Sequence, residues 1–244
     1  MDFRKLLREA RAEAARDRAG RQDVAPERPT PALEQPLTEQ PLPPPFDLAP
    51  RPTLSLPAHA IQDGTIYYIP NWISVEEEPS VLDQVHAAAP SAWVQLKYRR
   101  LQVWGGSVTT TYEPEPLPRW LQALSSGLVE AGVFAASETP NHALINDYAP
   151  GDGILPHEDG PMYYPLVAIL SAGASGRMTF QRHRETTPND VPVHLTLDRR
   201  SLLVFTGEAY TKYLHSIDNV DDEHGVNHRI SLTIRHVRPP STAC

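Results

Sequence analysis

The sequence predicts a mostly β domain with buttressing helices (α+β), in which the strands form a β-sandwich or barrel and the helices support one face. Two observations carry this prediction. Two helical patterns come first, and from residue 142 onward seven short strand-like segments follow, separated by Pro, Gly and Asp. Many short strands at this spacing are typical of sandwiches and barrels. The 244 residues suffice for one such domain with tails.

Composition limits the class of protein. The formal net charge is −8, and the single cysteine, Cys244, is the last residue, which leaves no disulfide framework or cysteine-based zinc site within the chain. No segment approaches the roughly 18 apolar residues of a membrane span, and no secretory signal is visible near Met1. We therefore expect a soluble monomer without membrane association, located in the cytoplasm and nucleus.

The ends of the chain differ from its centre. Residues 1–22 hold seven Lys/Arg against four Asp/Glu, and residues 25–60 hold eleven of the 26 prolines with almost no periodic apolar pattern. Such a segment cannot bury enough surface to offset its ordering entropy. We expect a disordered, basic and Pro-rich tail over 1–60, a folded domain over 61–239 and a short tail over 240–244. Apolar residues recur at helical spacing within 1–22, which predicts either a helix that docks a protein partner or a weak solvated helix.

The first predicted elements are a strand, a helix, a second strand and a second helix. "TIYYIPNWI" (65–73) is rich in aromatic and β-branched residues and predicts a strand that ends near Pro70. Ser74 and Glu77 have the spacing of a capping box, which predicts a helix from there to about residue 88. Residues 93–106 resemble a strand that ends in a glycine turn, and Pro118 opens a helix over 118–134.

The remaining elements are predicted as strands over 142–148, 166–171, 176–182, 193–197, 201–206, 210–216 and 229–237. The last strand alternates strictly, because Arg229, Ser231, Thr233 and Arg235 share one face while the residues between them are apolar. Two arginines inside an apolar core would be costly without anions. A dicarboxylate cosubstrate would pair with them, since guanidinium binds carboxylate bidentately. The alternative is an exposed strand face with solvated arginines.

A candidate metal site begins in "LPHEDGPMYYP" (155–165), where His157 and Asp159 stand two positions apart. Alone, such a pair is more typical of a solvated turn. His215, near the end of a strand, supplies a distant third ligand, and two histidines with one carboxylate form a facial triad that suits Fe(II) and leaves three positions open. His224 and His228 compete with His215 but fall in an acidic loop. A purely structural His215 is the alternative.

One further pair lies just upstream. Asn146 and Tyr148 share one face of the strand "HALINDY" (142–148), and both side chains can donate a hydrogen bond to a carboxylate. They could equally form a satisfied pair in the core.

The ordered set of Asn-x-Tyr, His-x-Asp, a distant His and two arginines six positions apart resembles the AlkB family of Fe(II)/2-oxoglutarate dioxygenases. The type called AlkB homologue six is the most similar. The phrases that carry the resemblance are "IYYIPNWIS", "WVQL…LQVWGG", "LPHEDGPMYYP", "EAYTKYLHSI" and "RISLTIR". Together they extend over about residues 61–238 and leave the first 60 residues unexplained.

The resemblance implies a double-stranded β-helix (jelly roll) that binds Fe(II) and 2-oxoglutarate. It implies that His157, Asp159 and His215 bind the iron, that Arg229 holds the distal carboxylate of 2-oxoglutarate, and that Asn146, Tyr148 and Arg235 complete that pocket. Ser231 stands where the bacterial archetype has asparagine, so its shorter side chain has less reach toward the cosubstrate. The implied reaction consumes O₂ and 2-oxoglutarate, gives succinate and CO₂, and removes an N-methyl group from a base of RNA or DNA as formaldehyde.

The substrate itself is less well specified by the sequence. A net charge of −8 is unusual for a nucleic-acid binder, because phosphate neutralisation dominates affinity. Basic and aromatic residues that are available to bind a flipped or single-stranded base are Lys97, Tyr98, Arg99, Arg100, Trp104, Tyr163 and Tyr164. The alternative is that the aromatics belong to the core and the charges to a solvated face. A protein or small-molecule hydroxylase of the same fold, or a catalytically silent nucleic-acid-binding module, are the rival functions.

Overall fold

The computed structural model of the protein describes residues 43–44, 46–62, 64–183, 191–218 and 228–238. The docking helix predicted within residues 1–22, the competing ligand His224 and the C-terminal tail over 240–244 lie outside the described residues.

The elements follow one another in the order η1 (Leu56–His59), β1 (Ala60–Gln62), β2 (Ile66–Ile69), α2 (Glu77–His86), η2 (Pro90–Ala92), β3 (Val94–Gln95), β4 (Arg100–Trp104), β5 (Gly106–Val108), β6 (Tyr112–Pro114), α3 (Arg119–Glu130), η3 (Ala136–Glu138), β7 (His142–Tyr148), β8 (Ile154–His157), β9 (Tyr163–Ala172), β10 (Gly176–Arg182), β11 (Val193–Leu197), β12 (Leu202–Thr206), α4 (Gly207–Thr211), β13 (Tyr213–Ile217) and β14 (Arg229–Val237).

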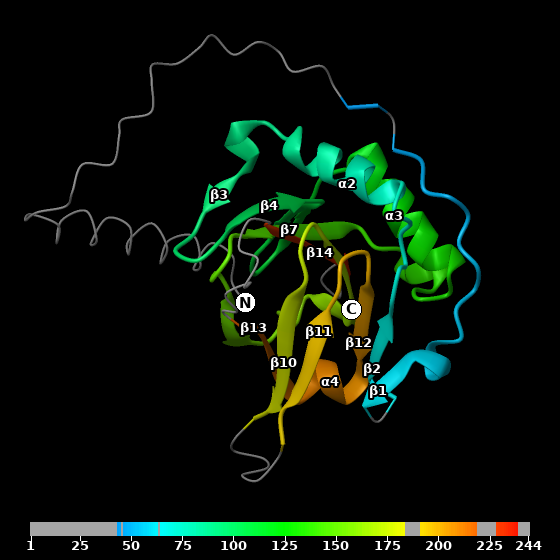
Figure 1. Ribbon diagram of the computed structural model, residues 1–244, viewed down its shortest axis with the longest axis vertical. Coiled ribbons are helices and arrows are strands. Elements are labelled where there is room, and N and C mark those ends of the chain that lie inside the picture. The colour runs from blue at the N-terminus through cyan, green and yellow to red at the C-terminus, as the bar shows by residue number, and fades with distance from the viewer. Residues whose placement is uncertain (1–42, 45, 63, 184–190, 219–227, 239–244) are drawn as a thin grey trace, which may run out of the picture.

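Two antiparallel sheets form a sandwich. The large sheet has the strand order β1-β2-β12-β9-β14-β7-β4-β3, and the small sheet has the order β11-β10-β13-β8. Figure 1 shows α2 and α3 together on the outer side of the large sheet, with β10 and β11 on its other side. The prediction of a mostly β fold with helices on one face is confirmed.

Each central strand of the large sheet contributes to two cores. In β12, Leu202 and Val204 pack against the helices, whereas Leu203 and Phe205 face the small sheet. Successive side chains of a strand point to opposite faces, so a strand covered on both sides is apolar throughout, as "LLVF" is. The space between the sheets is therefore enclosed, and any polar group there must find a partner.

Strand β14 brings charge into that enclosed space. Its isoleucines and leucine, Ile230, Leu232 and Ile234, join the core beneath the helices. Its other row points between the sheets, and Arg229 and Arg235 are only 4% and 5% exposed. The alternation in the sequence predicted this division, and the alternative of a solvated arginine face is excluded.

The beginning of α2 follows the predicted capping box. Ser74 Oγ accepts the N–H of Glu77 at 3.2 Å, and the Glu77 carboxylate accepts the N–H of Ser74 at 2.7 Å. Each side chain satisfies a backbone donor that the first helical turn leaves without a partner. The cap fixes where the chain leaves β2 and begins to cover the large sheet.

The strand expected over 210–216 was wrong in its first half. Gly207 has φ +55, and residues 207–211 form the short helix α4 before β13 begins at Tyr213. A glycine adopts this left-handed conformation without steric cost. The helical turn is needed because β12 belongs to the large sheet and β13 to the small one. Strand β8, which ends at His157, was not predicted at all.

The expected boundary at residue 61 also needs correction. Phe46 is 7% exposed and lies in the core beneath the helices, and the N–H of Leu54 donates to the carbonyl of Ala131 at 2.9 Å. Arg51 forms an ion pair with Glu77 and lies over the ring of Trp72. Residues 46–60 thus pack on the domain, because their few apolar side chains cover helices that would otherwise be bare.

None of the helices in the described part of the chain is long and apolar enough to span a membrane.

Candidate metal and cosubstrate site

Two histidines meet in the small sheet. His157 at the end of β8 is the direct partner of His215 on β13, and their ring centroids lie 4.3 Å apart. His157 Nδ1 lies 2.9 Å from the carbonyl oxygen of Leu155, which orients the ring and leaves Nε2 available. Burial, together with the neighbouring His157, lowers the pKa of His215 to about 3, and burial also lowers the pKa of His157. Both imidazoles are therefore neutral, the form in which they bind metals.

Asp159 lies just beyond β8 and reaches toward the large sheet. One of its oxygens forms an ion pair with Arg235, and the two side chains are 8% and 6% exposed. Burial alone would raise the pKa of Asp159, but the charge of Arg235 holds this pKa below its ordinary value. The second oxygen, Oδ2, is buried without any hydrogen-bond partner. The guanidinium carbon of Arg235 in turn lies 3.9 Å from the centroid of the Tyr163 ring.

Arg229 carries a buried and incompletely paired charge. Its Nη2 donates to Ser171 Oγ at 2.9 Å and more weakly to Ser231 Oγ at 3.4 Å, while Nε and Nη1 are buried without partners. Burial lowers the pKa of this guanidinium. A Cβ at Gly176 would approach Arg229 Cδ to 2.5 Å, so only glycine leaves room for the arginine in this position.

A cavity of about 220 Å³ adjoins this guanidinium, and its lining includes Tyr148 and Arg229. Tyr148 faces the same interior as Asn146, and the Arg229 guanidinium carbon lies 5.6 Å from the centroid of the Tyr148 ring. Asp147 points to the opposite face, where it pairs with Arg100 at 2.7 Å and with His228 at 2.6 Å. The predicted division of "HALINDY" into two faces is confirmed, and the competing ligand His228 lies away from His157.

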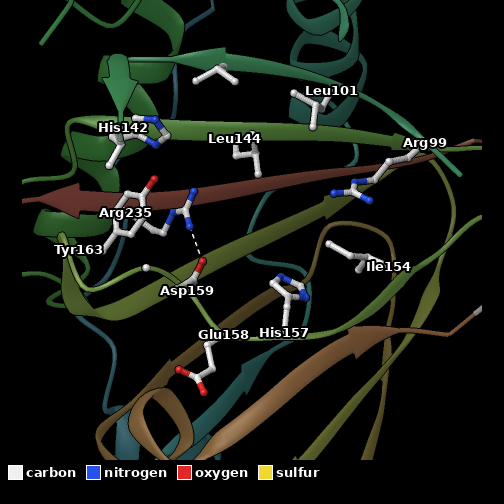
Figure 2. Close-up of a pocket in the computed structure, with 13 residues that line it drawn as sticks. Arg99, Leu101, His142, Leu144, Ile154, His157, Glu158, Asp159, Tyr163 and Arg235 are labelled. Atoms are coloured by element: carbon white, nitrogen blue, oxygen red, sulfur yellow. Dashed lines mark hydrogen bonds and ion pairs between the residues drawn. The ribbon is translucent and has the colours of Figure 1, made fainter. Parts of the chain in front are cut away.

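A smaller cavity of about 70 Å³ lies beside the predicted ligands, and Figure 2 shows its lining. Its polar wall includes His157, Asp159 and Arg235, and its apolar wall includes Leu101 and Leu144. Arg99 points into the same space from the side of Ile154. The cavity is thus an apolar pocket with a few convergent polar groups, as ligand sites commonly are.

A sequence model of the 2OG-Fe(II) oxygenase superfamily matches residues 65–235, which is most of the chain and contains every residue named above for the metal and cosubstrate site. The chain belongs to this superfamily. It is therefore an oxidoreductase, a dioxygenase that uses Fe(II) and 2-oxoglutarate.

Individual relatives place this oxygenase in the AlkB family. It is 39% identical over 201 residues to the zebrafish (Danio rerio) protein named "Probable RNA/DNA demethylase ALKBH6". The match covers 71% of this chain and 86% of the relative. It is 31% identical over 156 residues to the mouse (Mus musculus) "tRNA (carboxymethyluridine(34)-5-O)-methyltransferase ALKBH8", although this match spans only 23% of that longer protein.

Solved structures support the jelly-roll fold. The structure of OsALKBH1 matches with a TM-score of 0.56 at 13% identity, covering 70% of this chain and 98% of that chain. A 2OG-Fe(II) oxygenase family oxidoreductase from Burkholderia pseudomallei matches with a TM-score of 0.51 at 14% identity, over 72% and 85% of the two chains.

The donor groups present in the oxygenase fit these cofactors. Two neutral imidazoles and one carboxylate are the ligands that non-haem Fe(II) prefers, and the orphaned Asp159 Oδ2 is an oxygen that a cation would satisfy. Within the described residues, however, no trio of His, Cys, Asp or Glu is already arranged around a metal position. Figure 2 shows the Asp159 carboxylate pointing to Arg235.

The residues predicted to bind substrate divide into three groups. Arg99 and Tyr163 line the smaller cavity. Arg100 is occupied by Asp147 and lies over Trp93, and Trp104 packs against the core beneath the helices, with its N–H donating to Gln102. Trp104 therefore matches the alternative of a core aromatic, whereas Arg100 belongs to a structural ion pair rather than to a solvated face.

The remaining candidates lie outside the cavity lining. Tyr98 is 46% exposed on the β3–β4 hairpin, with the Lys97 ammonium 5.2 Å from its ring centroid. The ring of Tyr164 lies against the guanidinium of Arg238. Tyr98 and Lys97 are both exposed on this hairpin.

Two polar residues of the site were missed in the sequence. Ser171 on β9 is the register partner of Ser231 and holds Arg229. His142 at the start of β7 lines the smaller cavity, and burial and the nearby Arg235 lower its pKa to about 3. His142 shares a face with Asn146 and Tyr148, so strand alternation alone would have placed it inward.

Proposed function

We propose that this oxygenase removes N-linked methyl groups from the bases of RNA or DNA, and that His157, Asp159 and His215 bind its iron. The observation that carries the proposal is that two sets of polar side chains, one suited to a metal and one suited to a carboxylate, both lie in the space between the two sheets. A neutral histidine pair with an orphaned carboxylate oxygen occupies one part of it, and a buried arginine with free donors occupies another. The name of the zebrafish relative supports a nucleic-acid substrate.

The iron assignment rests on the state of each ligand. His157 and His215 present neutral rings from adjacent strands, so no proton has to be displaced before they bind a metal. Asp159 would contribute Oδ2, while Arg235 continues to hold Oδ1 and fixes the orientation of the carboxylate.

The assignment of 2-oxoglutarate rests on Arg229. Two of its N–H groups are buried and unpaired, and a buried cation without an anion is costly. The distal carboxylate of the cosubstrate would satisfy them bidentately. Asn146 and Tyr148 point into the same interior from β7. Arg235, six positions beyond Arg229 on the same face of β14, holds Asp159. Ser231 already accepts from Arg229, so its part is to orient the arginine.

With both cofactors bound, the site would use O₂ to hydroxylate a methyl group on nitrogen, and the resulting N-hydroxymethyl group releases formaldehyde. The protein's own residues bind and orient. Leu101 and Leu144 exclude water from the methyl group, and Arg99 and Tyr163 border the space in which the base would lie. The narrow cavity suits one base that has left its stack, so a single-stranded or flipped nucleotide is the substrate form.

The proposal also includes the cellular compartment, the oligomeric state and a protein partner of the enzyme. We also propose that it acts as a monomer in the cytoplasm and nucleus, reducing compartments that suit a chain with a single cysteine. The basic stretch over 1–22 would dock a protein partner.

The test measures three products in one reaction. The full chain is reconstituted with Fe(II) and 2-oxoglutarate and given a panel of N-methylated oligonucleotides, and succinate, formaldehyde and the demethylated base are quantified. Equal amounts of all three support the proposal. His157→Ala should abolish turnover, whereas His86→Ala, at the exposed end of α2, should leave it unchanged. Succinate formed with protein or small-molecule substrates, and with no oligonucleotide, would show a hydroxylase of another substrate class.

A further inference from the structure

Arg99 stands where the proposed substrate pocket and the cosubstrate region meet. It lies in the hairpin between β3 and β4, and its Nε donates to Asn146 Oδ1 at 2.9 Å. The rest of its guanidinium points into the smaller cavity beside Ile154 and above His157 (Figure 2). The bond to Asn146 holds the group in place, so the charge is a fixed part of the pocket wall.

Among the described residues, no carboxylate forms an ion pair with Arg99. Asp159 is engaged by Arg235, and Glu158 accepts from His183 Nε2 at 2.7 Å. Asp152 accepts the N–H of Ala149 at 3.0 Å and lines the larger cavity instead. Arg99 therefore has no ion-pair partner among the described carboxylates, and Asp152 acts on its charge only at longer range.

The apolar walls around Arg99 let its charge act strongly on a ligand in the pocket. Burial lowers the pKa of Arg99, partly offset by Tyr148 and Asp152, yet a guanidinium remains protonated at neutral pH. The nearby walls are apolar, with Leu101, Val103 and Leu144 on one side. Electrostatic interactions are weakly screened in such a space, so a ligand's charge and its hydrogen-bonding groups both matter there.

We propose, on the basis of the function proposed above, that Arg99 selects methylated bases that are electrically neutral and carry an oxygen acceptor, and rejects cationic methylated bases. The guanidinium retains N–H donors directed into the pocket, which a base carbonyl can accept. A base that carries a positive charge offers no such acceptor at the corresponding position and is repelled. Specificity of this kind arises from a repulsive element as much as from an attractive one.

The experiment compares two bases of the same shape. Oligonucleotides of one sequence carry either 3-methyluridine, which is neutral with an oxygen at C4, or 3-methylcytidine, which is cationic with an amino group there. Equilibrium binding to the full chain with Mn(II) and 2-oxoglutarate is measured without O₂. The neutral base should bind at least about 10-fold more tightly. 1-Methylguanosine against 1-methyladenosine repeats the comparison with purines.

Three variants separate charge from position. Arg99→Gln keeps a donor but removes the charge, so the preference should fall toward unity. Arg99→Lys keeps the charge and should retain most of the preference, although it cannot reproduce the bond to Asn146 in the same geometry. Arg100→Gln, whose side chain is occupied by Asp147 on the other face, is the matched control and should leave the ratio unchanged. Thermal melting and 2-oxoglutarate binding establish that each variant is folded.

Failure of the role proposed for Arg99 can be distinguished from failure of the proposed demethylase function. Equal binding of both oligonucleotides, a preference for the cationic base, or an unchanged ratio in Arg99→Gln would overturn the role of Arg99 while leaving demethylation intact. If neither methylated oligonucleotide binds better than the unmethylated one while succinate is still formed, the nucleic-acid function fails, and this inference with it.

Discussion

His157 and His215 are 58 positions apart in the chain and are direct partners across β8 and β13, with ring centroids 4.3 Å apart. Residues opposite each other in an antiparallel pair have Cβ atoms about 5 Å apart, which is suitable for two ligands of one ion. A slip of one residue would turn one ring to the other face of the sheet. Register, rather than loop conformation, thus brings the two imidazoles together.

Replacement of Arg229 by alanine should weaken 2-oxoglutarate binding severely. Removing one partner of a shielded charge pair costs about 2–5 kcal/mol, which is roughly 30-fold or more in affinity. Calorimetry with Mn(II) and without O₂ measures the loss, and metal affinity should largely survive. Arg177→Ala, at the exposed mouth of the same cavity, is the control and should change little. Unchanged affinity in a folded Arg229→Ala protein would contradict the proposed clamp.

Loss of Arg235 should make the protein depend on metal for its stability. Arg235→Leu leaves the buried Asp159 carboxylate without a counter-ion, at a cost of about 3–5 kcal/mol in the free energy of unfolding. A bound cation would compensate for that charge, so Mn(II) should raise the melting temperature of the variant more than that of the wild type. Asp159→Asn combined with Arg235→Leu should abolish this metal response. The same metal-induced shift in wild type and Arg235→Leu would argue against Asp159 as a ligand.

Truncations at two points should differ sharply in stability. Deletion of residues 1–42 should leave the melting temperature nearly unchanged, because the proline-rich part of this segment has almost no periodic apolar pattern to bury. Deletion of 1–60 removes Phe46 and the Arg51–Glu77 ion pair and should lower it strongly. Phe46→Ala alone should cost about 3 kcal/mol, measured by urea unfolding, and the exposed Asp47→Ala should cost little. Equal melting temperatures for both truncations would show that residues 46–60 add nothing to the domain.

Glu78 should make the domain sensitive to acid. Burial would raise its pKa, but hydrogen bonds from Arg199 and the N–H of Gly173, with the charges of Arg199 and Arg200, hold the pKa below 4.5. A carboxyl group whose pKa is lowered by folding stabilises the protein above its unfolded pKa, and this contribution disappears as the pH falls through the folded pKa.

The measurement compares unfolding free energies of wild type and Glu78→Gln from pH 7 downward. The difference should be largest at neutral pH and shrink below about pH 4.5 as Glu78 takes up its proton. Glu130→Gln, at the exposed end of α3, should show no such trend. A difference that stays constant with pH would show that Glu78 acts through packing rather than through its charge.

Part of the candidate site could be predicted from the sequence because its signals are local. Alternation in "RISLTIR" placed Arg229 and Arg235 on one face, and the capping box at Ser74 located the start of a helix. Both depend on backbone periodicity and on groups a few positions apart, which a sequence displays directly. The jelly-roll fold and the cofactors followed from five ordered motifs and are confirmed by the family to which the chain belongs.

Other features depended on contacts between distant segments. No sequence pattern predicts the hydrogen bond between Arg99 and Asn146, 47 residues away, or the ion pair between Arg100 and Asp147 on the opposite face of the sheet. It also could not reveal that residues 46–60 cover the helices, because a proline-rich segment with few apolar side chains resembles a tail until the surface that receives those side chains is known. Periodicity determines which way a side chain points along its own strand, whereas the partner it meets is decided by sheet order and register, which only the folded chain specifies.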